Sequence, residues 1–413
     1  MREMKDSGIE WIGEIPKDWT VLPIKYVFNI NRGRVISVLH LVENGKYPVY
    51  SSQTENDGCF GYLNTYDFEG PAITWTTDGA KAGSVFYRDG RYNCTNVCGI
   101  LQLKESYNDV NLYFATYAIA VVAQQNKRYD INGFKIMSNE MARIKFAIPN
   151  IVEQQQIADY LDTKCSEIDA TAEDIQKEIS LLEEYKKSLV YNVISNGINH
   201  SIYSTENDEV WGNLPQGWKL VDIKYLFEIV KRIAGKEGYD VLSVTQKGLK
   251  IKDITSGDGQ LADNYCGYQF VYPTDYVMNH MDLLTGWVDC SELFGVTSPD
   301  YRVFRLIDRS VHNLVYYKYV MQCCYMNKIF YSLGQGVSNL GRWRLQTSSF
   351  NNFKVPVPPK DEQDEIADYL DIKCSEIDAL IADKKRQRGI LAEYKKSLIY
   401  EYVTGKKEVP VHE

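Results

Sequence analysis

The residues of this chain that could do chemistry do not have the spacing of a catalytic or metal site. The five histidines, at positions 40, 200, 280, 312 and 412, form no zinc-ligand pattern, and the nine cysteines include no Cys-x-x-Cys pair. A methyltransferase would need a glycine-rich cofactor loop and an Asn/Asp-Pro-Pro-aromatic motif, and residues 356–359 lack both the Asn and the aromatic. No Walker A loop is found, and residues 336–341 miss the spacing of a nucleophile elbow by one position. We therefore predict no catalytic residue and no metal ligand.

The dominant feature of the sequence is an internal repeat. Residues 157–191 read IADYLDTKCSEIDATAEDIQKEISLLEEYKKSLVY, and residues 366–400 read IADYLDIKCSEIDALIADKKRQRGILAEYKKSLIY. At a constant offset of 209, 22 of these 35 positions are identical. Because an internal repeat identifies a duplicated structural unit, it outranks local propensity signals.

Both copies are predicted to be long helices. Apolar residues recur at heptad spacing in each copy, which is typical of a coiled-coil seam, and neither copy contains proline. At 1.5 Å per residue each helix would be roughly 60–70 Å long. The expected partner of each seam is the other copy, although Lys384 and Arg388 weaken its middle.

The outward-facing positions of the two helices are also repeated, which a coiled coil alone does not require. One explanation is a recent duplication that has not drifted. The other is a surface presented twice to two copies of a partner protein, which we favour because the globular segments before the helices have diverged almost completely. The candidate partner-binding residues are Asp159, Asp162, Glu167, Tyr185 and Lys187 in the first copy and Asp368, Asp371, Glu376, Tyr394 and Lys396 in the second.

The segments before the helices are rich in predicted strands and turns. Apolar runs at residues 70–75 and 83–87 are bounded by Asn-Gly and Asp-Gly pairs, and one helix is expected near 110–124. The second globular segment is similar, with one helix near 311–331. We predict an α+β fold with domains at 1–150 and 199–358 and helices at 151–198 and 359–413.

Composition places the chain among intracellular proteins without a membrane span. No run of 18 apolar residues occurs, and the first residues contain no hydrophobic signal core. The scattered cysteines favour reduced thiols in the cytoplasm. The net charge is −9, and all of the negative excess lies in the helical segments. Any nucleic-acid surface on the neutral globular segments must therefore be a local patch.

The order globule, helix, globule, helix has a geometric consequence. If the second helix packs antiparallel on the first, the two globules are expected at opposite ends of a coiled-coil pair, related by a pseudo-two-fold axis. Duplex DNA bound by such an arrangement would contain two half-sites at a fixed separation.

At this point the chain resembles a known family. The matching segments are residues 7–16, residues 148–149 with 153–157, residues 356–359 with 362–366, and residues 295–301. Together with the repeat they are similar to the specificity (S) subunit of type I restriction–modification systems, over the whole chain. The repeat architecture is specific, whereas each short motif alone would be weak.

The resemblance implies two target recognition domains, each reading one half of a bipartite DNA site. It implies spacer helices that dock two methyltransferase (M) subunits, and restriction (R) subunits in the fuller complex. The S subunit would be non-catalytic, because S-adenosylmethionine and ATP would belong to the partner subunits and adenine methylation to the M subunit.

Base readout needs Arg, Lys, Asn, Gln, Ser or Thr on loops that can enter a groove. In the first domain the candidates are Arg32, Arg34, Ser51, Ser52, Gln53, Thr77, Lys81, Arg128 and Tyr129. In the second they are Lys231, Arg232, Lys236, Thr245, Gln246, Lys247, Asn279, His280, Gln335, Arg342 and Arg344.

Three alternatives stay open, one of which keeps the family but makes this chain an alternative, interchangeable S subunit. A coiled-coil adaptor whose globules bind protein would give no sequence-specific DNA footprint. A methyltransferase or nuclease in its own right would bind cofactor or show activity as the isolated chain, and the missing motifs count against it.

Overall fold

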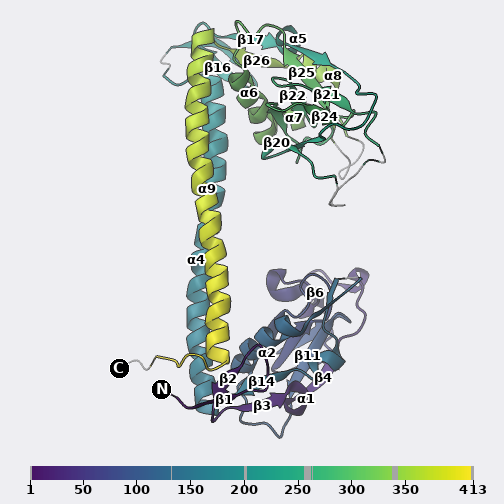
Figure 1. Ribbon diagram of the computed structural model, residues 1–413, viewed down its shortest axis with the longest axis vertical. Helices are drawn as coiled ribbons and strands as arrows, with labels where there is room; N and C mark the ends of the chain where they lie inside the picture. The colour runs from purple at the N-terminus through teal and green to yellow at the C-terminus, as the bar shows by residue number, and fades with distance from the viewer. Residues whose placement is uncertain are drawn as a thin grey trace. The chain divides into compact units, whose positions relative to one another are not determined.

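The computed structural model describes residues 2–131, 133–199, 202–254, 262, 264–336 and 343–410 (Figure 1). The chain divides into two compact units. Unit 1 comprises Met1–Ile175 and Arg386–Glu413, and unit 2 comprises Gln176–Lys385. Each unit therefore contains one globular domain together with part of each long helix.

The two repeated segments form long helices, as predicted. Helix α4 spans Ile151–Asn196 and helix α9 spans Lys360–Val403. Their predicted seam residues are buried near the globular domains: Leu161 and Leu370 are both 0% exposed. Arg388 is exposed, as expected for a charged residue that interrupts the seam. Among the described residues, no helix is long and apolar enough to cross a membrane.

The helices pair antiparallel in unit 1. The rings of Tyr160 and Tyr402 lie 4.6 Å apart, and Lys395 forms an ion pair of 2.6 Å with Asp169. Residue numbers thus increase along α4 in the direction in which they decrease along α9.

The same arrangement occurs within unit 2. Lys186 forms an ion pair of 2.7 Å with Asp378, and Lys384 contacts Glu178. Lys186–Asp378 is the counterpart of Lys395–Asp169 at the repeat offset of 209. Each unit therefore holds the same cross-helix ion pair with the roles of the two helices exchanged.

The domain of unit 1 is built on an antiparallel four-stranded sheet of order β4-β11-β8-β9. Helix α2 packs against this sheet at β8 and β9 (Figure 1). Its strands are β4 (Phe28–Arg32), β11 (Cys98–Leu103), β8 (Ala72–Thr76) and β9 (Val85–Arg88), and α2 spans Leu112–Asn126.

Smaller sheets complete this domain. A second four-stranded sheet has the order β6-β5-β10-β7, and β3 pairs with β14 just before α4 begins. The bounds are β1 (Met4–Asp6), β2 (Glu14–Pro16), β3 (Thr20–Pro23), β5 (Tyr47–Tyr50), β6 (Cys59–Leu63), β7 (Phe68–Glu69), β10 (Arg91–Cys94), β12 (Arg128–Asp130), β13 (Gly133–Lys135) and β14 (Lys145–Ile148). The short helices are α1 (Ile24–Val27) and α3 (Ser138–Met141).

The domain of unit 2 repeats the main topology. Its four-stranded sheet has the order β18-β25-β22-β23, and β17 pairs with β26 just before α9. The strands are β15 (Tyr203–Asp208), β16 (Gly212–Pro215), β17 (Lys219–Asp222), β18 (Phe227–Val230), β19 (Leu242–Thr245), β20 (Gly248–Ile251), β21 (Gln269–Val271), β22 (Tyr276–Met278), β23 (Val288–Cys290), β24 (Gly295–Thr297), β25 (Arg302–Leu306) and β26 (Lys354–Val357). The helices are α5 (Ile223–Leu226), α6 (Leu314–Met326), α7 (Ile329–Ser332) and α8 (Thr347–Asn351).

The helix expected near 110–124 is confirmed as α2, whereas the one expected at 311–331 is broken. Helix α6 ends at Met326, and Lys328 adopts a left-handed conformation with φ of 57° before α7 begins. A left-handed non-glycine residue interrupts helical hydrogen bonding, and apolar spacing alone did not reveal it.

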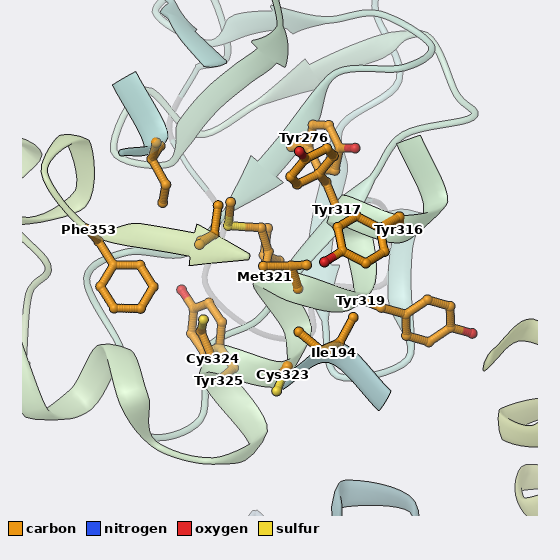
Figure 2. Packing of buried hydrophobic residues seen from close by; sticks show 14 of the residues in the cluster. Ile194, Tyr276, Tyr316, Tyr317, Tyr319, Met321, Cys323, Cys324, Tyr325 and Phe353 are labelled. Atoms are coloured by element: carbon orange, nitrogen blue, oxygen red, sulfur yellow. The ribbon is translucent and has the colours of Figure 1, made fainter. Parts of the chain in front are cut away.

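Each domain shares its hydrophobic core with both long helices. In unit 2, Tyr276, Tyr316 and Tyr317 lie in one buried cluster with Ile194 of α4 and Leu370 of α9. Figure 2 shows the aromatic and sulfur-containing side chains of α6 at the centre of this cluster. In unit 1, the corresponding core joins residues 157–168 of α4 to Leu398 and Tyr402 of α9. Each domain therefore packs against both long helices through one continuous apolar core.

A buried glutamine sets the junction between domain and helix in unit 1. Gln154 is 0% exposed, and its amide nitrogen donates to the carbonyl oxygens of Asp109 and Pro149, both at 2.9 Å. Its amide oxygen accepts a hydrogen bond of 2.8 Å from the backbone N–H of Asn111. One side chain thus joins the end of β14, the start of α2 and the first turn of α4.

Unit 2 contains the same junction at Gln363, which is 1% exposed. Its amide nitrogen donates to Pro358 O and its oxygen accepts from Asn313 N, both at 2.9 Å. A second contact is also repeated, because the indole N–H of Trp19 donates to Glu153 and that of Trp218 donates to Glu362. The repeated Glu-Gln pair at the start of each helix therefore orients the domain that precedes it.

We predict that replacing Gln154 with Leu locally destabilises unit 1. The substitution leaves the Asn111 N–H and the Asp109 and Pro149 carbonyls without partners, which costs about 2–4 kcal/mol when such groups are buried. Native-state hydrogen exchange of the α2 amides measures the loss. The control is Gln156→Leu at an exposed position of the same helix turn. Equal protection of α2 in both variants would contradict the proposed junction.

Candidate nucleic-acid interface

Three of the predicted DNA-binding residues of unit 1 gather around residues 94–97. The Arg32 side chain donates to Asn96 O, and the backbone N–H of Arg34 donates to Cys94 O at 3.1 Å. The Ser51 hydroxyl accepts a hydrogen bond of 3.0 Å from Thr95. Because Arg34 is also paired with Asp67 at 2.8 Å, its guanidinium is held in place at the surface. Ser52 and Gln53 follow in the same segment and are half-buried.

A second group in unit 1 is formed by the hairpin of β12 and β13 and the loop after β8. The backbone of Ile136 donates to Thr77 O at 2.8 Å, and Gly79 N donates to Phe134 O at 3.0 Å. Arg128 is fixed by ion pairs with Asp130 and Glu140, while Tyr129 on the same strand is exposed. Lys81 is exposed, and it forms no ion pair with any residue that the structure describes.

Thr77 does not suit the role that we expected of it. The side chain is 0% exposed, so its hydroxyl cannot reach a base edge in this conformation. Its place in a glycine-punctuated loop predicts exposure, but loop position alone does not reveal burial. Its backbone instead holds the neighbouring hairpin.

Three further predicted residues of unit 2 follow strand β18. Lys231 and Lys236 are exposed. Arg232 differs, because it pairs with the buried carboxylate of Asp275 and lies 4.8 Å from the Tyr272 ring centroid. The Arg232 guanidinium is thus held by the domain's own Asp275 although it is half-buried.

The strongest convergence of predicted residues lies elsewhere in unit 2. The backbone N–H of Leu345 donates to His280 O at 2.9 Å, and Gln335 and Arg344 exchange two backbone hydrogen bonds of 3.0 and 3.1 Å. These contacts place Asn279 and His280 beside Gln335 and Arg344. Arg342, also predicted, lies outside the described residues.

The turn between β19 and β20 joins this group. Gln246 and Lys247 are exposed at the turn, and the Gln246 amide donates to Thr285 O at 3.4 Å. Thr245 is turned inward, and its hydroxyl donates to Gly248 O at 2.9 Å. Asn279 also lines a cavity of about 450 Å³ with Ser243 and Tyr301, next to this turn.

Buried groups hold this convergence in place, and sequence reasoning missed them. Arg302 is 4% exposed and donates to Leu345 O at 3.0 Å, and the Tyr325 hydroxyl donates to Asn279 O at 2.7 Å. Burial lowers the pKa of Arg302 to about 10. An arginine within an apolar strand and a tyrosine within an apolar helix carry no sequence signal of such a role.

Two of the repeated helix residues, Asp162 and Asp371, form hydrogen bonds within the chain. The Tyr117 hydroxyl donates to Asp162 at 2.8 Å, and the Tyr319 hydroxyl donates to Asp371 at 2.7 Å. These aspartates had been assigned to partner binding because they recur. Each therefore has a contact to the helix of its own domain that also accounts for its recurrence, and both remain exposed at the helix surface.

Other repeated residues remain at the surface of the helices. Tyr185 and Tyr394 are 58% and 55% exposed. Lys164 bonds to Glu167 at 2.8 Å, and Lys373 bonds to Glu376 at 2.9 Å in the other unit. Asp159, Asp368 and Lys396 are exposed and Lys187 is half-buried.

Comparison with known proteins identifies the family. The family model described as "Type I restriction modification DNA specificity domain" matches residues 16–181 and 215–387. The chain belongs to this family. Its predicted role as a specificity subunit that recognises a DNA target, and not as the catalytic subunit, follows from that membership.

Curated relatives support the assignment. The chain is 31% identical over 191 residues to the type I restriction enzyme MpnII specificity subunit of Mycoplasma pneumoniae, covering 45% of this chain and 56% of that protein. It is 23% identical over 437 residues to a sequence of Methanocaldococcus jannaschii named as a type I restriction enzyme MjaX specificity subunit, covering 96% of each. A chain in a solved structure of a type I restriction–modification system shares the fold, with a TM-score of 0.66, 12% identity and coverage of 95% and 99%.

We predict that His280 makes unit 2 sensitive to acid. Burial first, and then the nearby Arg302 and Arg344, lower the pKa of His280 to about 4. Because an unfolded histidine titrates near pH 6.5, the unfolded chain binds more protons below that pH and unit 2 loses stability as pH falls from about 6.5 to about 4. His280→Gln should flatten this part of the stability profile, measured by thermal unfolding across the range. Unit 1 is the internal control, and an unchanged profile for unit 2 would refute the assignment.

Proposed function

We propose that the chain reads a bipartite DNA site, with residues 1–150 reading one half and residues 199–358 the other. The proposal is supported chiefly by one observation. The two domains share a sheet topology and a glutamine junction to the following helix, but their exposed candidate residues differ. Two domains that recognise different half-sites would need this combination: the same attachment to the helices and different exposed residues.

The candidate contacts fall into two kinds. Arg344, Asn279, Gln335 and Gln246 carry donors suited to base edges and lie on neighbouring segments of unit 2. Lysines such as Lys81, Lys236 and Lys247 are exposed, and they suit phosphate contacts, which position a protein without specifying sequence.

We further propose that the repeated helix surfaces dock two methyltransferase subunits. Each surface combines both helices of its unit. The pKa of Lys164 is raised first by its hydrogen bond to Glu167 and also by nearby Tyr394, and the pKa of Lys373 is raised in the same way by Glu376 and Tyr185. These two equivalent patches include Asp159, Asp162 and Lys187 in one copy and Asp368, Asp371 and Lys396 in the other.

The partners would supply the chemistry. S-adenosylmethionine and methyl transfer to adenine would belong to the methyltransferase subunits, and ATP-driven cleavage to restriction subunits in the full complex. Because the helices are acidic, they would repel DNA. Stable DNA binding would therefore require the assembled complex, in which the partners enclose the duplex.

Mapping of modified adenine tests the bipartite site. Coexpression of the chain with its methyltransferase subunit should yield a split motif, two specific halves around a fixed gap. Exchanging residues 205–358 for those of a related chain should change one half only. A continuous motif, or no methylation, would refute two independent readers and favour the adaptor alternative.

Point substitutions separate the two kinds of contact. Arg344→Ala should cost about 1–3 kcal/mol at one base pair and relax specificity there, because a bidentate contact discriminates between bases. Lys247→Ala should weaken binding to all sequences similarly and reduce its salt dependence. Competition binding with single-base variants of the mapped site measures both. A uniform loss for Arg344→Ala would reassign that residue to the backbone.

A further inference from the structure

The hairpin of β12 and β13 presents an apolar side chain, that of Ile131, to solvent at its turn. Ile131 at its turn is 101% exposed, and Tyr129 on the first strand is 74% exposed. A lone exposed apolar side chain is ordinary on a protein surface. This one is unusual because the hairpin that carries it is firmly anchored.

Several contacts hold the hairpin in one orientation. Arg128 bridges Asp130 on the same strand and Glu140 of α3, and Lys135 also pairs with Asp130 at 3.1 Å. The rings of Tyr129 and Phe134 meet edge to face across the strands, with centroids 5.3 Å apart. Backbone hydrogen bonds from the loop after β8 fix the second strand, as described above. These contacts hold the hairpin that carries Ile131 in one orientation.

The charges at the base of the hairpin and in the loop that it contacts favour a polyanion as its partner. The Lys127 ammonium lies 4.6 Å from the Phe134 ring centroid at the base of the hairpin. Lys81 lies in the loop that the hairpin contacts through Gly79. Neither lysine has an ion pair with a carboxylate in the part of the chain that the structure describes, whereas Arg128 and Lys135 do. An exposed apolar side chain on a hairpin whose base and adjoining loop carry these lysines matches a groove between phosphate backbones better than an apolar protein surface.

The dimensions of DNA indicate which groove. The major groove, about 12 Å wide, admits a two-stranded β-ribbon, whereas the minor groove is only about 6 Å wide. The floor of the major groove is lined with hydrogen-bond donors and acceptors, and its apolar group is the C5-methyl of thymine. An isoleucine placed against any other base edge would leave a polar group without a partner.

We propose that Ile131 is a specificity-determining residue that contacts a thymine methyl group in the half-site read by unit 1. This inference rests on the proposed function and extends it to one residue and one chemical group. In unit 2, residues 337–342 lie outside the described part, so the assignment concerns unit 1 alone.

The test removes single methyl groups from the DNA. The chain, assembled with its methyltransferase subunits, is titrated with duplexes of the mapped site. Each thymine of the unit 1 half is replaced in turn by deoxyuridine, which lacks the C5-methyl. One replacement should weaken binding about fourfold, the equivalent of burying one methyl-sized group. In Ile131→Ala the thymine and deoxyuridine duplexes should bind equally at that position.

Leu39→Ala is the matched control, because Leu39 is an apolar residue of the same unit that is 92% exposed. It should retain the fourfold discrimination. The proposal is overturned if the unit 1 half contains no thymine on either strand, if no replacement matters, or if Ile131→Ala keeps the discrimination. It is also overturned if Ile131→Ala instead releases the methyltransferase subunit, because Ile131 would then contact protein.

These outcomes are distinct from failure of the proposed function. Without a bipartite methylation motif the proposed function itself fails. A bipartite motif that is insensitive to deoxyuridine leaves that function intact and removes only the role of Ile131. Since the Ile131 side chain is fully exposed, its replacement should leave the unfolding temperature of unit 1 unchanged, which confirms that the variant is folded.

Discussion

In each unit, the attachment of the domain to the long helix that follows it depends on one buried side-chain amide, that of Gln154 in unit 1 and that of Gln363 in unit 2. Each sits in the first turn of a long helix and satisfies backbone groups of the last strand and the domain helix at once. Buried backbone donors and acceptors must be paired, so these positions tolerate few side chains. A domain held in this way keeps a fixed orientation to the helix that follows it, whatever its outer surface carries.

The attachment of each domain to its helix is separate from its exposed surface, so one fold can carry different surface residues. The interior of unit 2 contains a tyrosine-rich cluster whose hydroxyls bind surrounding backbone, as Tyr325 does at Asn279 and Tyr276 at Leu314. Unit 1 contains a different solution, in which buried Arg88 pairs with Asp57 and its guanidinium lies 3.6 Å from the Tyr50 ring centroid. The two domains share topology without sharing these interactions, so the same arrangement of strands is held together by different side chains in each.

The helix repeat has at least two physical origins. Asp162 and Asp371 recur because each receives a tyrosine hydroxyl from its own domain, and Asp169 and Asp378 recur because each pairs with a lysine across the helices. Tyr185 and Tyr394 have no such explanation, since more than half of each side chain is exposed. Recurrence alone therefore does not identify a binding surface. Recurrence at positions that the fold does not need is the more informative signal.

Local pattern in the sequence was enough to predict both long helices, their antiparallel seam, the two α/β domains and the family. Heptad spacing and repeat identity are properties of the order of residues in the chain, which is why they can be read without coordinates. The sequence could not show that Thr77 is enclosed, that Lys328 interrupts a helix, or that Asp162 faces Tyr117. Nor could it show that Asn279, Gln335 and Arg344 meet. The left-handed turn at Lys328 is local, but the other facts depend on contacts between residues far apart in the chain. Only the tertiary structure decides which of many polar side chains share one surface.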